Sequence, residues 1–521
     1  MAEIVLSTLN AKYIHTAFGL RYLMANLGDL ASRTALVEFD LNRRPLELAE
    51  ALLKHEPRIL GLGVYIWNVT QTTELVAILK RLRPDLCIIL GGPEVSYEYN
   101  TQPIVALADY VITGEADLKF AEVCRRLLAG DRPPAKIILA ELPEFHRLKL
   151  PYAFYTPEDL AHRLTYVEAS RGCPFSCEFC LSSLDIPVRQ APLPDILAAL
   201  ADLLDRGSTQ LKFVDRTFNL DLKFSRAILE FLLTRYQPGH LYHFELVPDR
   251  LPDELREIIV RFPPGALQFE VGIQTFNPEA ATLIQRRQNY DRLAENLRFL
   301  RQHTGVHIHA DLIFGLPGED AASFATGFDR LLAFQPQEIQ VGILKRLRGT
   351  SLGRHDAEWG MVYNPNPPYD ILQNRLIPFA EMQRLRRFAR YWDLVANSGN
   401  FARTAPLIWE STPSAFASFM QLSDWLHQTV GRTDAISLPR LMELLHQYLV
   451  RERGLTAIAV AESLLRDYQA PGRREIPGFL QAHLPATQSH PPVPQTSTRK
   501  RRQDRHLTGE TSSMKEMEAE R

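Results

Sequence analysis

Three cysteines at close spacing are the residues most able to do chemistry. Cys173, Cys177 and Cys180 form a C-x3-C-x2-C pattern within the stretch EASRGCPFSCEFCLSS, residues 168–183, directly after the apolar run 164–167. This order places three thiols on one loop after a short strand. A cubane [4Fe–4S] cluster normally takes four cysteine ligands, so three thiolates leave one iron open. A catalytic metal keeps an open position for its substrate in the same way. The spacing therefore predicts an iron–sulfur cluster with one reactive iron.

A structural zinc knuckle is the alternative interpretation of these cysteines. Such a site needs a fourth ligand close by, usually from a second C-x2-C pair or an H-x3–5-H pair. His162 lies on the other side of the predicted strand, and His243 lies far downstream. Because neither histidine fits, we favour the cluster over zinc and over reduced spectator thiols.

Length and composition limit the class of protein. A chain of 521 residues with 45% hydrophobic content can form two or three cores. The formal charge of −2 provides no overall attraction to nucleic acid or anionic membranes. Charged residues interrupt every apolar run before the roughly 20 residues that span a bilayer, and no secretory leader is recognisable. We expect a cytoplasmic protein in which Cys87 and Cys124 are buried and reduced.

Residues 1–130 alternate short apolar strands with amphipathic helices, which predicts a doubly wound parallel sheet of flavodoxin-like type. Ligands bind such a sheet beyond the carboxyl ends of its strands. The small and polar residues expected at those ends are Ser7, Thr8, Gly63, Gly91, Gly92, Pro93, Glu94, Gly114 and Glu115. No G-x-G-x-x-G motif opens a helix, so dinucleotide binding is weakly supported.

The central part of the chain has a different repeat. Residues 131–160 are rich in proline and are expected to be a linker. Residues 161–352 contain six strand–helix units, which predict an open partial (β/α)6 barrel with its site at the carboxyl ends of the strands. Polar residues fall at those ends, although simpler roles are open for single ones. Asp215 and Glu319 could cap the following helices, and Glu270 could pair with Arg216.

The last part of the chain is expected to be helical and then irregular. Residues 353–485 form a series of amphipathic helices without strands, which predicts a third, all-helical domain. Residues 486–521 are rich in Pro, Ser, Thr, Lys and Arg and are expected to be a disordered tail. The basic segment KRRQDR is interpreted as solvated rather than as a nucleic-acid contact.

The cysteine spacing, the strand before it, Phe179 and the Arg171-Gly172 lead-in resemble the radical SAM superfamily. The resemblance implies that the open iron chelates S-adenosylmethionine and cleaves it reductively to a 5′-deoxyadenosyl radical. The chain lacks the three further upstream cysteines of methylthiotransferase-like members. The S-adenosylmethionine contacts that the resemblance implies are Phe179, Asp215, Asn219, Glu245, Gln274 and Gly315.

The segments LGLGVYIWN, IILGGPEVS and DYVITGEAD resemble the cobalamin-binding domain of B12-dependent radical SAM proteins. The strand-end residues of the first domain are then expected cobalamin contacts. The D-x-H-x-x-G signature is absent, so we expect no histidine on cobalt, His15 included, and expect Trp67 and Asn68 to line its lower face. An empty flavodoxin-like scaffold is the alternative, because fold alone does not carry function.

Together these resemblances imply an enzyme that transfers a methyl group to, or rearranges, an unactivated carbon. Its cofactors would be the [4Fe–4S] cluster, S-adenosylmethionine and cobalamin, and a flavodoxin or ferredoxin would donate electrons. The alternative is a non-enzymatic cobalamin or redox sensor whose helical domain binds a partner. Polar residues at several barrel strand ends favour the enzyme, since a sensor would not need them. The sequence does not identify the substrate.

Overall fold

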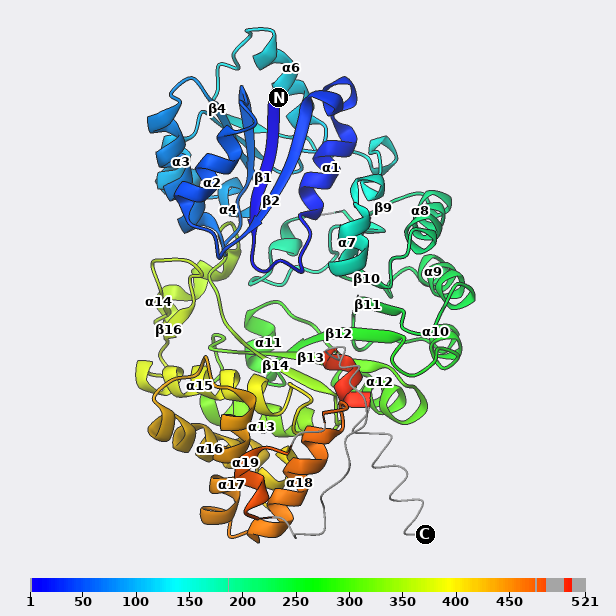
Figure 1. The fold of residues 1–521 in the computed structure, drawn as a ribbon, viewed down its shortest axis with the longest axis vertical. Coiled ribbons are helices and arrows are strands. Elements are labelled where there is room, and N and C mark those ends of the chain that lie inside the picture. Colours follow the sequence, from blue (N-terminus) through cyan, green and yellow to red (C-terminus); the bar gives the residue numbers. More distant parts are fainter. Residues whose placement is uncertain (1, 186, 474–475, 484–500, 508–521) are drawn as a thin grey trace.

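The computed structural model describes residues 2–185, 187–473, 476–483 and 501–507. Two six-stranded sheets follow one another along the chain, with helices packed around both, and a helical region completes the fold (Figure 1). This arrangement confirms the predicted α/β class with a parallel first sheet, a second parallel sheet and a helical C-terminal region.

The first sheet is parallel and has the order β2-β1-β3-β4-β5-β6. Its strands are β1 Ile4–Asn10, β2 Thr34–Asp40, β3 Ile59–Gly63, β4 Cys87–Gly91, β5 Tyr110–Thr113 and β6 Ile137–Leu139. β1, β3 and β5 are buried along their whole length, as expected when helices cover both faces of a parallel sheet. One face packs against α1 Phe18–Asn26 and α6 Lys119–Leu128, and the other packs against α2 Pro45–Leu53, α3 Val69–Leu82 and α5 Pro103–Leu107.

The segment expected to be a linker, residues 131–160, contributes to this fold. Its residues 137–139 form β6, which pairs with β5 at the edge of the sheet. An edge strand has one neighbour only, so prolines on either side of it break no ladder. The same segment ends in α7, Pro157–His162, which Thr156 caps by accepting a hydrogen bond from the Asp159 amide.

The second sheet is also parallel and has the order β14-β13-β12-β11-β10-β7. Its strands are β7 Thr165–Val167, β10 Gln210–Phe213, β11 Leu241–Leu246, β12 Leu267–Gln274, β13 His307–Phe314 and β14 Glu338–Ile343. The connecting helices include α8 Leu193–Asp205, α9 Leu222–Thr234, α10 Asp253–Ile259, α11 Pro278–Leu283, α12 Tyr290–His303 and α13 Ala321–Leu332. β7 and β14 are the two edges, so the sheet stays open, as the six-unit pattern predicts.

The helices after the second sheet share its hydrophobic core. They are α15 Phe379–Val395, α16 Ala415–Val430, α17 Leu438–Arg451, α18 Ala457–Gln469 and α19 Gly478–Gln481. Phe328 of α13 packs edge-on against Phe388 and Trp392 of α15. The region is not free of strands, however, because β15 Val362–Tyr363 and β16 Ile371–Gln373 form a short antiparallel pair beside α14 Asp356–Trp359.

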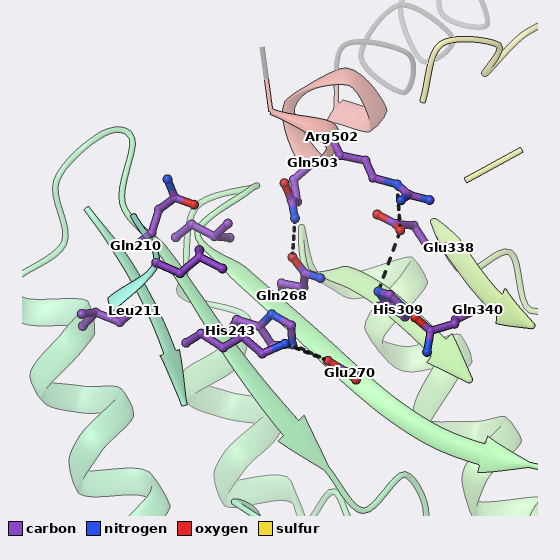
Figure 2. Close-up of a pocket in the computed structure, with 13 residues that line it drawn as sticks. Gln210, Leu211, His243, Gln268, Glu270, His309, Glu338, Gln340, Arg502 and Gln503 are labelled. Atoms are coloured by element: carbon purple, nitrogen blue, oxygen red, sulfur yellow. Dashed lines mark hydrogen bonds and ion pairs between the residues drawn. The ribbon is translucent and has the colours of Figure 1, made fainter. Parts of the chain in front are cut away.

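The tail expected to be disordered from 486 onward is ordered in one part. Residues 501–507 dock against the second sheet (Figure 2), where Arg502 pairs with Glu338 of β14 at 2.9 Å and Asp393 of α15 at 2.7 Å. Gln503 donates a 2.7 Å hydrogen bond to Gln268. A composition poor in apolar residues shows that a segment cannot form its own core, but not whether its charges find partners elsewhere. The other residues of that stretch lie outside the described ones.

Candidate active site

The cysteine loop is closed at its base by backbone contacts. Cys173 donates its amide to the Asp185 carbonyl at 3.1 Å. Gly172 has a φ of +91°, and a Cβ there would lie 2.6 Å from the same carbonyl oxygen, so only glycine fits. Cys173, Cys177 and Cys180 all line one cavity of about 400 Å³, here called the cluster cavity, at the carboxyl ends of β11–β13.

A buried glutamate anchors the middle of the loop. Glu178 accepts hydrogen bonds from His355 at 2.8 Å and Gln285 at 2.6 Å, and it pairs with Arg354. The carboxylate of Glu178 is held inside the protein, and the next residue, Phe179, lines the cluster cavity. The loop that carries the thiols is therefore attached to the connections that follow both β12 and β14.

The cluster cavity contains acceptors that lack partners. Gln274 Oε1 and Gln288 Oε1 are buried and have no hydrogen-bond partner among the described residues, and Asp311 Oδ1 has only a long contact, 3.4 Å from His309 Nε2. Buried polar atoms are normally satisfied, so unpartnered ones in a cavity indicate a ligand or water. A ligand with several hydrogen-bond donors fits them. S-Adenosylmethionine offers such donors in its ammonium, ribose and adenine groups.

Two residues shape the wall beside Cys177. Gln274 adopts a left-handed φ of 71° where the register between β12 and β13 shifts, and a Cβ on Gly272 would lie 2.4 Å from its Nε2. Arg286 donates to the Gly272 carbonyl and places Nη1 3.6 Å from Cys177 Sγ. A guanidinium at this distance stabilises negative charge on a thiolate.

Three predicted S-adenosylmethionine contacts do not line the cluster cavity. Asp215 is 1% exposed and accepts hydrogen bonds from the Ala169 amide at 3.0 Å and the Ser170 hydroxyl at 2.6 Å. Asn219 bonds to the backbone of Val247, and Gly315 lies beneath Ile371. The other predicted contacts, Phe179, Glu245 and Gln274, do line it.

The simpler roles considered for three carboxylates are wrong. α9 is capped by Asp221 and α13 by Asp320, so neither Asp215 nor Glu319 is a helix cap. Glu319 instead accepts a hydrogen bond from Thr275 at 2.7 Å.

Glu270 does not pair with Arg216 either. Glu270 bonds to His243 at 2.9 Å and Lys212 at 3.3 Å, whereas Arg216 pairs with Glu245 at 2.8 Å.

Arg286, Arg287 and Gln288 also line the cluster cavity, and no sequence pattern pointed to them. They follow the short helix α11 rather than a strand, so a search of strand ends passes over them. Arg287 is exposed and forms no ion pair with any residue that the structure describes.

A second cavity lies at the opposite, amino-terminal mouth of the sheet and was not predicted. It measures about 310 Å³ and is lined by His243, Glu270, His309, Glu338 and the docked Arg502 (Figure 2). Burial lowers the pKa of His309, but the neighbouring Asp311, Glu338 and Glu270 outweigh burial and raise that pKa to about 9. Because Glu270 borders both cavities, polar side chains continue through the open barrel.

The carboxyl ends of the first sheet surround a third cavity of about 240 Å³, here called the glycine cavity. Predicted residues that line it are Gly63, Gly91, Gly92, Gly114 and Glu115. Gly92 has a φ of +108°, and a Cβ there would lie 2.4 Å from the Val64 carbonyl oxygen. Tyr65 and Arg171 line the same cavity and were missed. Because its glycines carry no side chains, the cavity is mostly apolar, and at about 240 Å³ it has room for part of a cobalamin but not for a whole corrin.

The other predicted cobalamin contacts lie outside the glycine cavity. Asn68 is fully buried and bonds to Thr8 Oγ1 and the carbonyls of Leu9 and Gly63, so it joins strand ends together. Trp67 stacks on Tyr65 with ring centroids 4.5 Å apart and is 45% exposed.

The remaining residues have other partners. Ser7 is buried within β1, Pro93 begins α4 Pro93–Ser96, and Glu94 pairs with Arg348 at 2.8 Å. His15 bonds to the Tyr166 hydroxyl at 2.7 Å, at the junction of the two sheets.

One arginine joins the glycine cavity to the cysteine loop. Arg171 directly precedes Gly172 and pairs with Glu115 and Asp117, each at 2.9 Å, and with Glu168 at 2.8 Å. Glu115 and Asp117 follow β5 of the first sheet, so the loop that carries the thiols is held against the ligand edge of the other sheet.

Comparison with known proteins gives three family matches in chain order. Residues 4–124 match the B12 binding domain, residues 167–330 match the radical SAM superfamily, and residues 357–521 match a protein family of unknown function, DUF4080.

An uncharacterised methyltransferase of Pyrococcus horikoshii is 27% identical over 35% of this chain and 44% of its own length. The 2-(S-pantetheinyl)-carbapenam-3-carboxylate methyltransferase of Streptantibioticus cattleyicolor is 23% identical over 55% of this chain and 46% of its own length. The chain spans about half the length of the curated relatives that it matches.

Among solved structures, the fold is similar to that of the radical S-adenosylmethionine methyltransferase TsrM from Kitasatospora setae. The structure with cobalamin and a [4Fe–4S] cluster bound has a TM-score of 0.56 and 17% identity, and the match covers 74% of this chain and 82% of that one. The fold and the matched models define the class as radical SAM proteins.

The chain carries, in order, a B12 binding domain, a radical SAM domain and a DUF4080 region. The cofactors of its two cofactor-binding domains are a [4Fe–4S] cluster with S-adenosylmethionine, and cobalamin. In the ranges that the structure describes, no helix is long and apolar enough to cross a membrane.

The cysteine loop yields a prediction about iron. Anaerobically purified protein should hold about four irons and four sulfides, and Cys173→Ala, Cys177→Ala or Cys180→Ala should abolish the visible iron–sulfur absorbance. Cys87 and Cys124 are the matched controls, because neither of them lines the cluster cavity. Equal loss of absorbance in all five variants would overturn the assignment.

Asp215 yields a prediction about pH. Burial raises its pKa from 3.8 to about 7, so the folded protein holds a proton there that the unfolded chain releases near pH 4. The stabilisation is full below pH 4 and is lost as the pH rises from 4 to 7, by at most about 4 kcal/mol. Between pH 4 and pH 7, the melting temperature of Asp215→Asn should therefore change less with pH than that of the wild type. Asp221→Asn, which alters a helix cap on the same connection, should keep the wild-type dependence of melting temperature on pH. The same dependence in Asp215→Asn would refute this account.

Proposed function

We propose that this protein is an enzyme that uses a [4Fe–4S] cluster, S-adenosylmethionine and cobalamin to transfer a methyl group to an unactivated carbon, or to rearrange one. One observation carries the proposal. The glycine cavity and the cysteine loop share Arg171, which lines the first and directly precedes the second. This shared residue supports two cofactor sites that lie next to each other.

We propose that Cys173, Cys177 and Cys180 hold the cluster. No group of three His, Cys, Asp or Glu side chains in the described ranges is arranged around a single metal ion. A cubane does not need such a group, because each thiolate binds a different iron, and lining one cavity is enough. Arg286 would stabilise the thiolate of Cys177 from outside the cluster.

S-Adenosylmethionine would occupy the rest of the cluster cavity. Gln274, Gln288 and Asp311 would accept hydrogen bonds from its donors, and the free charge of Arg287 would attract its carboxylate. Phe179 would exclude water from one wall. When bound, the cluster supplies the electron that cleaves S-adenosylmethionine, and cobalamin supplies a transferable methyl group.

Cobalamin would lie at the carboxyl edge of the first sheet, with a flat part in the glycine cavity. The cavity wall has no histidine, and His15 is held by Tyr166 away from it, which supports binding without a histidine on cobalt. Tyr65, which stacks on Trp67 and lines the glycine cavity, would contact the cofactor in place of Trp67.

Similarity to methyltransferases favours methyl transfer over rearrangement, and the unpartnered acceptors of the cluster cavity favour an enzyme over a cobalamin sensor, which needs no S-adenosylmethionine site. An external donor must supply electrons, and we propose a flavodoxin or ferredoxin. We also propose a cytoplasmic location, because all five cysteines are unpaired and such clusters need a reducing compartment.

The proposal is tested with anaerobically reconstituted protein, dithionite and S-adenosylmethionine. We expect release of 5′-deoxyadenosine, and we expect Asp311→Asn to weaken S-adenosylmethionine binding by about ten- to a hundredfold because it removes a charged acceptor. Asp320→Asn, a change to the exposed cap of α13, should bind normally. A reconstituted wild type with a complete cluster that produces no 5′-deoxyadenosine would argue for the sensor.

A further inference from the structure

A fourth cavity lies between the first sheet and the region after β14. It measures about 460 Å³ and is here called the junction cavity. Figure 1 shows α14 and β16, the elements beside it, between the first sheet and the C-terminal helices. Its lining residues are Glu98, Arg346, Arg348, Asp356, Met361, Val362, Tyr363, Asn364, Pro365 and Tyr369. The sequence analysis expects ligands at the carboxyl edge of the first sheet, but it names none of these residues as a contact.

The junction cavity is next to the cluster cavity. Leu347 lines the cluster cavity, while Arg346 and Arg348 on either side of it line the junction cavity. These three consecutive residues therefore border two different spaces. A molecule in the junction cavity is separated from the cluster cavity by the width of one chain segment.

Three polar atoms around the junction cavity have no partner. Arg346 Nε, Asp356 Oδ1 and the Tyr363 hydroxyl are covered atoms without a hydrogen bond to any described residue, although the whole side chains of Arg346 and Asp356 are 42% and 41% exposed. Arg346 is held only loosely, since its nearest carboxylate oxygens, on Asp356 and Glu98, lie 3.9 and 4.0 Å away. Polar atoms that gather at one cavity without partners indicate a ligand that satisfies them.

Arg348 provides a useful contrast at the same cavity. It donates to Glu94 at 2.8 Å and to Tyr369 at 2.9 Å, and it pairs with Glu98 at 3.1 Å. This arginine is fully engaged in holding the two parts of the protein together. Arg346 is therefore the cation that remains available to a ligand.

The charge balance of the cavity selects the ligand. Two arginines and two carboxylates line it, so a polyanion such as a phosphate ester would meet as much repulsion as attraction. A zwitterion matches both signs. Met361, Val362 and Pro365 add an apolar wall for a side chain.

We propose that the junction cavity binds a free α-amino acid with an apolar side chain. Its carboxylate accepts hydrogen bonds from Arg346 Nε and the Tyr363 hydroxyl, and its ammonium group donates to Asp356 Oδ1. The inference concerns binding only, so it holds or fails independently of the proposed methyl transfer.

Saturation-transfer NMR and calorimetry on the full-length, anaerobically purified protein test the proposal. Each proteinogenic amino acid is titrated singly up to millimolar concentration, followed by phenethylamine and 3-phenylpropionate, which lack the carboxylate and the ammonium group of phenylalanine. We expect apolar amino acids to bind and both analogues, like inorganic phosphate, to bind much more weakly. Failure of every amino acid to bind, or equal binding of an analogue or phosphate, overturns the proposal.

Substitutions of the lining residues test whether amino acids bind in the junction cavity. Arg346→Gln should weaken amino-acid binding by about ten- to a hundredfold, and Tyr363→Phe by about two- to tenfold, as expected for charged and neutral hydrogen bonds. Arg375→Gln, an exposed arginine after β16 that does not line the junction cavity, is the matched control and should bind like the wild type. Circular dichroism and melting curves show whether each variant is folded. Wild-type affinity in folded Arg346→Gln and Tyr363→Phe would place the site elsewhere.

Discussion

The position of the cysteine loop depends on the ion pairs of Arg171. Its side chain is 10% exposed, contacts carboxylates from both sheets and lies 4.4 Å over the ring of Tyr22. Removing one partner of a buried pair leaves an uncompensated charge, which typically costs about 3–5 kcal/mol. Because Gly172 and Cys173 follow immediately, this interaction sets where the thiols lie relative to the first sheet. The loop cannot shift along that sheet without breaking it.

Two further groups of ion pairs hold the same arrangement elsewhere. Arg21, which is 2% exposed, bonds to Glu38 of β2 at 2.6 Å and to Asp159 of α7 at 2.8 Å, and Arg163 pairs with the same two carboxylates. On the other side, Arg348 joins the end of the first sheet to the segment after β14. The cluster, glycine and junction cavities are therefore fixed relative to one another by charge pairs at three places. Fixed cavities suit a reaction in which separately bound groups must meet in one geometry.

Much of the fold and part of the site were predictable from the sequence. Periodicity predicts both sheets, because alternating buried strands and amphipathic helices allow few other packings. The spacing of the cysteines places them on one loop. Strand ends identify the right edge of each sheet but not the direction of each side chain, which is why Asp215 and Asn68 prove to be internal hydrogen-bonding residues. Arg286 follows a helix rather than a strand, and Arg502 lies far along the chain from Glu338, its partner in the sheet. Local sequence patterns therefore do not indicate either residue.

The central claim is that the cluster and cobalamin bind side by side in one chain, and electron paramagnetic resonance tests it most directly. The protein is loaded with reduced cluster alone, with Co(II) cobalamin alone, and with both, and the relaxation rates and line widths of the two signals are compared. The account predicts faster relaxation and broadening of both signals in the doubly loaded protein, because neighbouring spins couple through space. Two signals that simply add, with unchanged relaxation, would contradict it.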